Sequence, residues 1–375
     1  MRKIERVLIV GAGLAGLTLA ISLRRQGLDA EIVERQATWP VHGAGIYLVG
    51  NAMRALGSLD LADDVLRDGA LIQTQTFMNH RGRQLAVIDT ASVWADCGPC
   101  VGIRRADLHS KLVNALGGAV VRFSATVTSL LQREDCAVVR FDDGRERLYD
   151  LVVGADGIRS SIRKLVFKSV QPRFCGQVGW RFLVPCPASI TGWTLFAGDR
   201  GVFLFIPVGH GQAYCYADAL VTEPLDDPLE GRLERLRSRF DTYASPVPQA
   251  LAELRTSDQI HFGAIEDILQ EPCGIGNVLL IGDAAHATSP NMASGAAMAF
   301  EDALVLSRLI AAERSAAQVL DEYTSERMPR IRWVHEQTHR RDRIRSLPSM
   351  VRDLMLRYLA KSVYRANYAP LVAER

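Results

Sequence analysis

A glycine pattern near the N-terminus constrains the fold of this chain more than any other feature. The apolar run Val7–Val10 leads into Gly11-Ala-Gly13-Leu-Ala-Gly16, and a stretch with helical spacing of apolar residues follows. In such a strand–loop–helix unit, the glycines let the backbone turn tightly and approach a pyrophosphate, whose charge meets the helix N-terminus. The pattern therefore predicts a βαβ unit that binds an ADP-containing ligand.

The residues that follow favour this interpretation over an accidental match. Leu17 and Ile21 have helical spacing, and Gly27 stands where the C-cap of a helix belongs. A second short strand, Ala30–Glu34, ends in a carboxylate that stands where a ribose hydroxyl would be. A glycine fingerprint alone is a weak signal, but this context makes it specific.

Length and composition limit the class of protein. At 375 residues the chain exceeds the size at which one hydrophobic core usually stops growing, so we expect two domains. A net charge of +2 gives no general case for binding nucleic acid, and no apolar stretch approaches the roughly 20 residues that span a bilayer. The short apolar run after Met1-Arg-Lys-Ile is interpreted as a strand instead of a signal peptide, because it ends in the glycine loop.

The cysteines indicate a reducing compartment. Seven of them, an odd number, are scattered mostly through apolar stretches, so we expect a cytoplasmic protein without a disulfide framework. Cys97-Gly-Pro-Cys100 has the spacing of a dithiol redox motif, which stays open as an alternative. The residues on either side of this motif are typical of a loop that enters a strand, which favours a coincidental match to the redox motif. Because no second cysteine pair completes a zinc site, we expect no metal.

The order of the predicted elements indicates interleaved domains. Strands predicted in 120–153 end in Asp150–Gly154 and return the chain to the nucleotide fold, and a buried strand at Val278–Ile281 returns it once more. Between these parts, 177–219 holds aromatic-rich strands with period-two alternation, which predicts an antiparallel sheet. The other predicted elements are helices over 51–66, 105–116 and 295–314 and a strand pair over 74–89.

The C-terminal stretch 330–365 is rich in arginine. Its pattern predicts two basic amphipathic helices broken at Pro348. A solvated face that packs on the main body is the favoured interpretation, and a surface for a partner or a membrane is the alternative.

Two further motifs follow the glycine loop along the chain. They are Gly154-Ala-Asp156-Gly157-Ile-Arg-Ser160-Ser-Ile-Arg163 and Gly282-Asp283-Ala-Ala-His286. This ordered set, over nearly the whole chain, resembles the FAD-dependent aromatic hydroxylases, single-component flavoprotein monooxygenases typified by para-hydroxybenzoate hydroxylase. The resemblance implies an α/β fold, with a Rossmann-type FAD-binding domain on a parallel sheet, a mainly antiparallel-sheet substrate domain interleaved with it, and C-terminal helices.

The expected domain limits follow from this arrangement. They are 1–75, 100–170 and 275–325 for the discontinuous FAD-binding domain, 76–99 and 171–274 for the substrate domain, and 326–375 for the C-terminal helices. A homodimer is left open.

The resemblance also implies which residues bind FAD. Gly11, Gly13 and Gly16 would hold the pyrophosphate and Glu34 the adenosine ribose, while Asp283 would bind the ribityl or pyrophosphate region. Gly295 would open a helix whose peptide N–H groups face the flavin pyrimidine ring. The remaining cofactor residues implied are Arg35, Arg105, Val127 through its backbone near the adenine, Asp156 and Gly157.

Two details qualify the match. Relatives commonly have Gly-Gln-Gly after the proline, whereas this chain has Ala293-Ser294-Gly295 and keeps only the last glycine. Asp156 taken alone is also typical of an ordinary turn aspartate. A second dinucleotide fingerprint is missing, which agrees with transient binding of the nicotinamide, because a disulfide reductase would be expected to carry one.

The implied chemistry is hydroxylation of a small aromatic or N-heteroaromatic substrate. NADH or NADPH would reduce the flavin, and O₂ would form a flavin hydroperoxide that transfers a hydroxyl group. Candidates for polarising or deprotonating the substrate are Tyr47, Tyr214 and Tyr216, with His210 and Arg181 as weaker ones. Packing within a strand is the alternative for the tyrosines. Trp180, Phe203 and Phe205 would line an apolar pocket or fill the core, and His286 would shape the loop beside the cofactor.

Five other functions remain open. A flavoprotein of the same fold could act as an epoxidase, a Baeyer–Villiger-type oxygenase or a dehydrogenase on a larger, natural-product-like molecule. A dithiol oxidoreductase and a non-enzymatic flavin-binding protein are the more distant classes. The chain lacks the paired-tryptophan motif of flavin-dependent halogenases, and Glu34 does not separate NADH from NADPH because it belongs to the FAD site.

Overall fold

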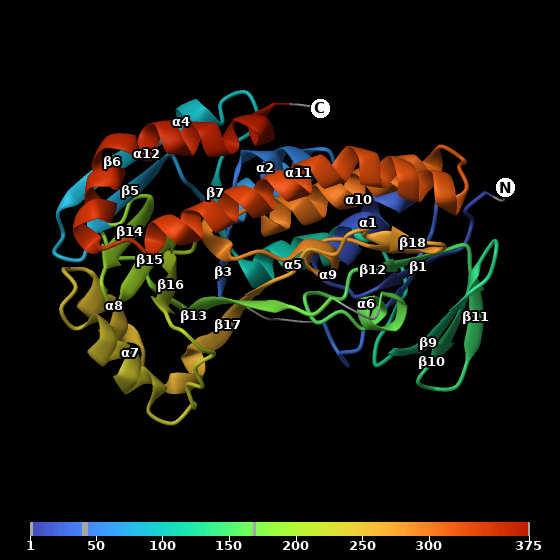
Figure 1. Ribbon diagram of the computed structural model, residues 1–375, viewed down its shortest axis with the longest axis horizontal. Coiled ribbons are helices and arrows are strands. Elements are labelled where there is room, and N and C mark those ends of the chain that lie inside the picture. Colours follow the sequence, from blue (N-terminus) through green and yellow to red (C-terminus); the bar gives the residue numbers. More distant parts are fainter. Residues whose placement is uncertain (1–2, 40–43, 168–169, 374–375) are drawn as a thin grey trace. The chain divides into compact units, whose positions relative to one another are not determined.

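The computed structural model describes residues 3–39, 44–167 and 170–373. It divides into two compact units, each assembled from three separate parts of the chain (Figure 1). The first unit comprises 1–41, 109–173 and 266–338, and the second comprises 42–108, 174–265 and 339–375. The predicted domain limits differ from these units at 42–75, which belongs to the second unit, and at 326–375, which is divided between the two units after residue 338. As limits of folding domains they stay a prediction.

The first unit is built on a six-stranded sheet that begins with the predicted βαβ unit. The strand order is β18-β19-β12-β1-β2-β8, and only the edge pair β18–β19 is antiparallel. The strands are β1 (Val7–Val10), β2 (Glu31–Val33), β8 (Val121–Arg122), β12 (Leu151–Gly154), β18 (Gly274–Ile275) and β19 (Val278–Leu280). All residues of β1, β12 and β19 are buried, as expected for parallel strands whose two faces are covered.

Helices and a small sheet complete the first unit. Helix α10 packs along α1, and α11 runs beside α10 (Figure 1). The helices are α1 (Leu14–Arg25), the part of α5 (Arg105–Ala115) from His109 on, α6 (Ser161–Val166), α9 (Asp283–His286), α10 (Gly295–Ala311) and most of α11 (Ala316–Arg345). The small antiparallel sheet consists of β9 (Val127–Gln132), β10 (Ala137–Phe141) and β11 (Glu146–Tyr149).

The second unit contains the expected aromatic-rich sheet. It has seven strands in the order β17-β13-β16-β15-β14-β5-β6, all antiparallel neighbours where the register is defined except the parallel pair β14–β5. The strands are β5 (Thr74–Asn79), β6 (Gln84–Asp89), β13 (Arg173–Pro185), β14 (Trp193–Gly198), β15 (Gly201–Pro207), β16 (Gln212–Leu220) and β17 (His261–Asp267). A three-stranded sheet of β3 (Gly45–Leu48), β7 (Val101–Arg104) and β4 (Ala70–Leu71) belongs to the same unit.

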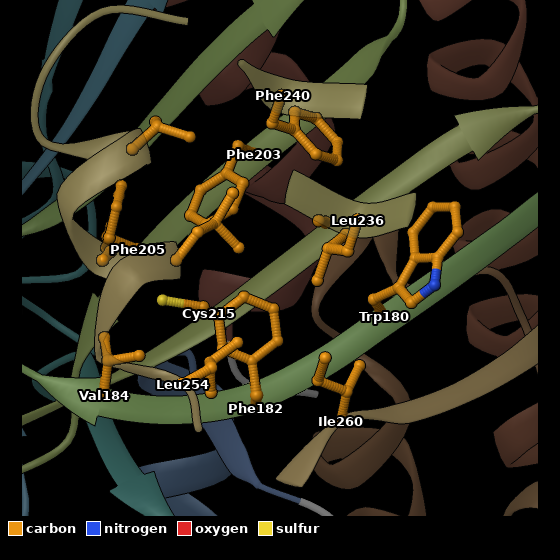
Figure 2. Close-up of a cluster of buried hydrophobic side chains, with 14 of the residues drawn as sticks. Trp180, Phe182, Val184, Phe203, Phe205, Cys215, Leu236, Phe240, Leu254 and Ile260 are labelled. Carbon is orange, nitrogen blue, oxygen red and sulfur yellow. The ribbon is translucent and has the colours of Figure 1, made fainter. Parts of the chain in front are cut away.

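One face of the seven-stranded sheet carries an apolar core (Figure 2). Alternate residues of β13, β15 and β16 point into it, and Leu236 and Phe240 of α7 (Arg232–Phe240) cover them. Trp180, Phe203 and Phe205 all lie in this cluster. Of the two alternatives for these residues, the core is therefore confirmed and the apolar pocket lining is wrong.

The helices of the second unit correct two boundaries. The helix predicted over 51–66 is in fact two, α2 (Gly50–Gly57) and α3 (Ala62–Asp68), with a turn that includes Asp60 at φ 52°. The predicted break near Pro348 is confirmed, because α11 ends at Arg345 and α12 (Ser349–Val372) begins after it. The remaining helices are α4 (Thr90–Val93) and α8 (Val247–Glu253). No helix in the described ranges is long and apolar enough to cross a membrane.

Candidate functional site

The glycine loop of the first unit turns where only glycine fits. Gly11 has φ 108°, and a Cβ atom there would lie 2.5 Å from the Ala155 carbonyl oxygen. A Cβ on Gly16 would collide with the Gly11 carbonyl oxygen, whereas one on Gly13 would meet nothing within 4 Å. No side chain in the described residues caps α1, so its first N–H groups face this open space.

Glu34 is held by the same loop. Its Oε2 accepts a hydrogen bond from the Ala12 N–H at 2.9 Å, and its Oε1 accepts one from the Gln36 N–H at 2.9 Å. The His109 ring contacts the Ala12 carbonyl oxygen at 3.0 Å through Nε2. His109 was not predicted, because it lies on α5, far along the chain from the glycine pattern. Each carboxylate oxygen of Glu34 retains a free lone pair for a further donor.

In the second motif, Asp156 caps a helix. Its Oδ2 accepts from the Ser161 N–H at 2.6 Å and from the Ser161 hydroxyl at 2.8 Å, while its buried Oδ1 has no hydrogen-bond partner among the described residues. Gly157 follows with φ 80°. Asp156 is thus a turn aspartate whose second oxygen is still available to a donor.

Arg163 joins the second motif to the third. Its side chain is buried, and Nη1 donates to the Ala284 carbonyl oxygen at 2.7 Å. Burial lowers the pKa of this guanidinium, and Asp156 opposes that shift. The two short motifs, far apart in the chain, form one structure around this side chain.

The third motif places a carboxylate in front of a helix. Asp283 is exposed at the start of α9, and its Oδ1 lies 3.9 Å from the position of a Cβ on Gly295, which opens α10. The nearby Ser294 hydroxyl bonds the Met292 carbonyl at 2.9 Å, so no side chain among the described residues caps α10. The N-terminus of a helix carries partial positive charge and accommodates an anionic ligand.

The departure from the family pattern has a structural consequence. Ala293 has φ 48°, in the left-handed region that favours glycine. The chain therefore keeps at Ala293 the backbone conformation that a glycine would adopt with less strain.

The other predicted cofactor residues are distributed over both units. Arg35 is exposed just after β2, and Val127 is buried at the start of β9, both in the first unit. Arg105 is exposed at the start of α5, in the part that belongs to the second unit.

The three candidate tyrosines lie in the second unit. Tyr214 and Tyr216 occupy one face of β16, opposite the face where Cys215 enters the apolar core. The Tyr214 ring packs on Gly45, where a Cβ would lie 2.6 Å from its Cγ. Tyr47, two residues further along β3, accepts a hydrogen bond from Gln75 Nε2 at 3.2 Å. The Tyr216 hydroxyl is buried and has no hydrogen-bond partner among the described residues.

These tyrosines are neutral phenols. Burial raises the pKa of Tyr47 well above its usual value, as do Cys100 and Tyr364 nearby. Burial also raises the pKa of Tyr216 well above its usual value, with Asp218 adding to the shift and Arg181 and Arg345 opposing it. For Tyr214 burial again raises the pKa, although a hydrogen bond with Arg181 acts against it. His210, the other weak candidate, lies in a turn with Nε2 3.7 Å from Asp107 Oδ2.

The Cys97–Cys100 segment is a loop in which the two cysteines are buried while Pro99 between them is exposed. Neither cysteine forms a disulfide within the described residues, and burial raises the pKa of Cys100 to about 12. A reactive dithiol needs an accessible thiolate. The structure favours the coincidental match for this motif.

Comparison with known proteins agrees with this architecture. A model of the FAD binding domain family matches residues 5–338. A 3-amino-4-hydroxybenzoate 2-monooxygenase of Streptomyces platensis is 33% identical over 364 residues, 92% of this chain and 89% of its own. An aurachin C monooxygenase/isomerase of Stigmatella aurantiaca is 33% identical over 327 residues, 86% and 85% of the two chains. The crystal structure of Klebsiella pneumoniae HpxO with FAD and uric acid matches with a TM-score of 0.90 at 25% identity, covering 98% and 97%.

A parallel sheet with a glycine loop, a carboxylate after the second strand and an uncapped helix is typical of a dinucleotide-binding protein. The chain belongs to the FAD binding domain family, in the branch of FAD-dependent aromatic hydroxylases. It is an FAD-dependent monooxygenase.

Proposed function

We propose that this monooxygenase hydroxylates a small aromatic or N-heteroaromatic compound, with O₂ and with NADH or NADPH as co-substrates. The observation that carries the proposal is the full-length match to the HpxO structure, which holds FAD and uric acid. The name of the Streptomyces relative gives a substituted hydroxybenzoate as its substrate. Both are small, electron-rich rings.

The first unit offers the residues that would hold FAD. Gly11, Gly13 and Gly16 would accommodate the pyrophosphate, because the loop is open only at Gly13 and the α1 N-terminus faces that space. Glu34 would accept the ribose hydroxyls. Asp283 would bind the ribityl or pyrophosphate region, and the peptide N–H groups at Gly295 would face the flavin pyrimidine ring.

The other assignments rest on position in the motifs. Val127 would contribute backbone near the adenine, and Arg35 and Arg105 would contact the cofactor from their exposed positions. Asp156 and Gly157 would support both FAD and transient nicotinamide binding, and the unpaired Asp156 Oδ1 supports this by leaving an acceptor free.

Bound FAD would supply hydride acceptance and oxygen activation, which no side chain of this protein can perform. The chain would supply the environment. The uncapped N-terminus of α10 would stabilise negative charge on the reduced cofactor. Tyr47, Tyr214 and Tyr216 would polarise a phenol-like substrate through hydrogen bonds, because their raised pKa values keep them protonated and unsuited to act as bases.

The Tyr216 hydroxyl is the strongest of these three candidates. A buried hydroxyl without a partner costs about 1–3 kcal/mol, so a structure that retains one usually has a missing partner such as a ligand. Arg181, whose guanidinium carbon lies 5.4 Å from the centre of the Tyr216 ring, contributes positive charge to the same face.

A larger, natural-product-like substrate is the second candidate. It is favoured by the match to the aurachin C monooxygenase/isomerase, whose name adds a second reaction type, isomerisation, to monooxygenation. Epoxidation, Baeyer–Villiger-type oxygenation and dehydrogenation belong to this candidate. The assembly as a homodimer stays a prediction, which light scattering on the purified protein tests.

The test is NADH and NADPH oxidation in air by the FAD-loaded protein. The panel contains phenols, aminohydroxybenzoates, hydroxypyridines, purines and alkylquinolones, and the products are analysed by mass. We expect one ring class to stimulate oxidation and to gain one oxygen atom. If every small ring is inert and a larger compound is oxidised, the second candidate replaces the first.

A further inference from the structure

A buried ionic network behind the Gly282–Asp283 turn has no role in the function described so far. Its centre is Asp302, which is fully buried in the second turn of α10. Asp302 Oδ2 accepts from the Gly282 N–H at 3.0 Å and lies 2.5 Å from His286 Nε2. Its Oδ1 accepts from Arg327 Nε of α11 at 2.8 Å. A single carboxylate thus binds both ends of the short segment that carries Asp283.

The segment that carries Asp283 packs closely between two helices. Gly282 has φ 57° and ψ −143°, a conformation open essentially to glycine alone. A Cβ at this position would lie 3.1 Å from the Ala15 side chain and 3.3 Å from that of Ala299. The turn is therefore pressed between α1 and α10, and α9, with only four residues, cannot hold it in place by itself.

The charges of the network keep Asp302 ionised. Burial acts to raise the pKa of its carboxyl group, but His286 and Arg327 lower it well below the usual range. Arg327 Nη1 also pairs with Glu301 at 2.9 Å, and Arg330 pairs with the other oxygen of Glu301 at 2.8 Å. The carboxylates of Asp302 and Glu301 are thus balanced by the guanidinium groups of Arg327 and Arg330.

We propose that Asp302 is a positioning residue for the cofactor site. By tying the Gly282 N–H and the His286 ring to α10, it fixes the Asp283 carboxylate in front of Gly295, at the end of the same helix. This inference rests on the proposed role of Asp283 in binding FAD. Asp302 itself is buried and acts only through the turn.

The test is a double-mutant cycle on FAD affinity, with the variants Asp302→Asn, Asp283→Asn and the double variant. Asparagine has nearly the volume of aspartate, but it removes the charge and replaces one acceptor oxygen with a donor NH₂ group. We expect Asp302→Asn to raise the Kd of FAD about tenfold, equal to about 1.4 kcal/mol. In the Asp302→Asn background, Asp283→Asn should then cost much less than it costs in the wild type. Amide hydrogen exchange over 282–286 should become faster.

Asp218→Asn is the matched control. Asp218 is also fully buried and pairs with an arginine, Arg345, but both lie in the second unit. We expect it to lower the unfolding temperature as Asp302→Asn does, without changing FAD affinity. If Asp302→Asn is insoluble, His286→Asn, which leaves the Asp302–Arg327 pair in place, should show the same direction of change.

The outcomes separate this inference from the proposed function. If Asp283→Asn weakens FAD binding while Asp302→Asn leaves Kd unchanged, or if the two effects simply add, Asp302 does not act through Asp283 and only this inference fails. If Asp283→Asn itself leaves FAD affinity unchanged, the assignment of Asp283 to the cofactor fails as well.

Discussion

The parallel sheet of the first unit and the large sheet of the second unit present their candidate sites in different ways. In the first unit the site consists largely of backbone: a glycine loop, two helix N-termini and two turns. In the second unit it consists of side chains on one face of β16, whose opposite face is an apolar core (Figure 2). A site made of backbone needs glycines, because a Cβ atom would fill the space. A site made of side chains needs a face of the strand that does not pack into the core.

The largest expected effect on ligand binding is at the backbone site. Gly16→Ala places a methyl group against the Gly11 carbonyl oxygen, so the loop must move. We expect the Kd of FAD to rise at least about 100-fold, or about 2.7 kcal/mol, as measured by flavin fluorescence. Gly263→Ala is the control, because a Cβ there meets nothing within 4 Å. Tight FAD binding by Gly16→Ala would contradict the backbone site.

The apolar face should contribute to stability and leave chemistry unaffected. Phe203→Ala empties the centre of the cluster and should cost about 3–5 kcal/mol of unfolding free energy, measured by denaturant titration. We expect FAD affinity of the folded variant to stay at the wild-type value. A specific loss of substrate affinity would return Phe203 to the pocket lining that the structure argues against.

The opposite face of the sheet, which carries Tyr216 on β16, should show the opposite result: an effect on substrate binding and little effect on stability. Tyr216→Phe removes a hydroxyl that has no partner among the described residues, so unfolding free energy should change by less than about 0.5 kcal/mol or increase. With the identified substrate, we expect KM to rise about tenfold if the hydroxyl binds it. Tyr243→Phe is the control, because its hydroxyl donates to the Gly201 carbonyl at 2.8 Å and its loss should destabilise the fold. Wild-type KM in Tyr216→Phe would remove this residue from the site.

The ionic network predicts a dependence on pH. The pKa of Asp302 is lowered in the folded state, so its stabilising effect is present above the unfolded pKa of about 3.9 and is lost as pH falls through the lower folded value. The groups facing it are His286, Arg327, Tyr323 and Cys273. The difference in unfolding free energy between wild type and Asp302→Asn should be at its full value above about pH 5 and become smaller as pH falls below about 4. If this difference in unfolding free energy does not change with pH, the carboxylate charge of Asp302 is not its cause.

The smallest expected effect is at the cysteine pair. Because the pKa of Cys100 is raised to about 12, the folded protein should not be alkylated at this thiol at neutral pH. Cys97→Ser and Cys100→Ser should keep monooxygenase turnover and FAD binding, apart from a modest loss of stability from burying a hydroxyl. If both variants lose turnover while FAD stays bound, the hypothesis of a dithiol oxidoreductase is supported again.

The backbone site was largely predictable from the sequence. After a buried strand, the spacing of Gly11, Gly13 and Gly16 is typical of a phosphate-binding loop, and Glu34 follows at the end of the next strand. Local spacing was therefore enough to predict this site. The strand pair over 74–89 and the break near Pro348 were predicted for the same reason, since turn residues and proline act locally. The split of 51–66 was missed because Asp60 takes a positive φ that the sequence does not mark.

The sequence by itself determined the class of fold, the cofactor family and the order of the motifs, because each rests on contacts between residues close in the chain. Only the tertiary structure decided which side chains meet across long separations. The alternation along β13 and β15 indicated that Trp180 and Phe203 each point to one face of the sheet. The packing of α7 against that face makes it the core. Likewise, nothing in the spacing links Asp302 to Gly282 or Arg327. These residues meet because α10 and α11 pack beside the parallel sheet, and that packing arises from the burial of whole helix faces.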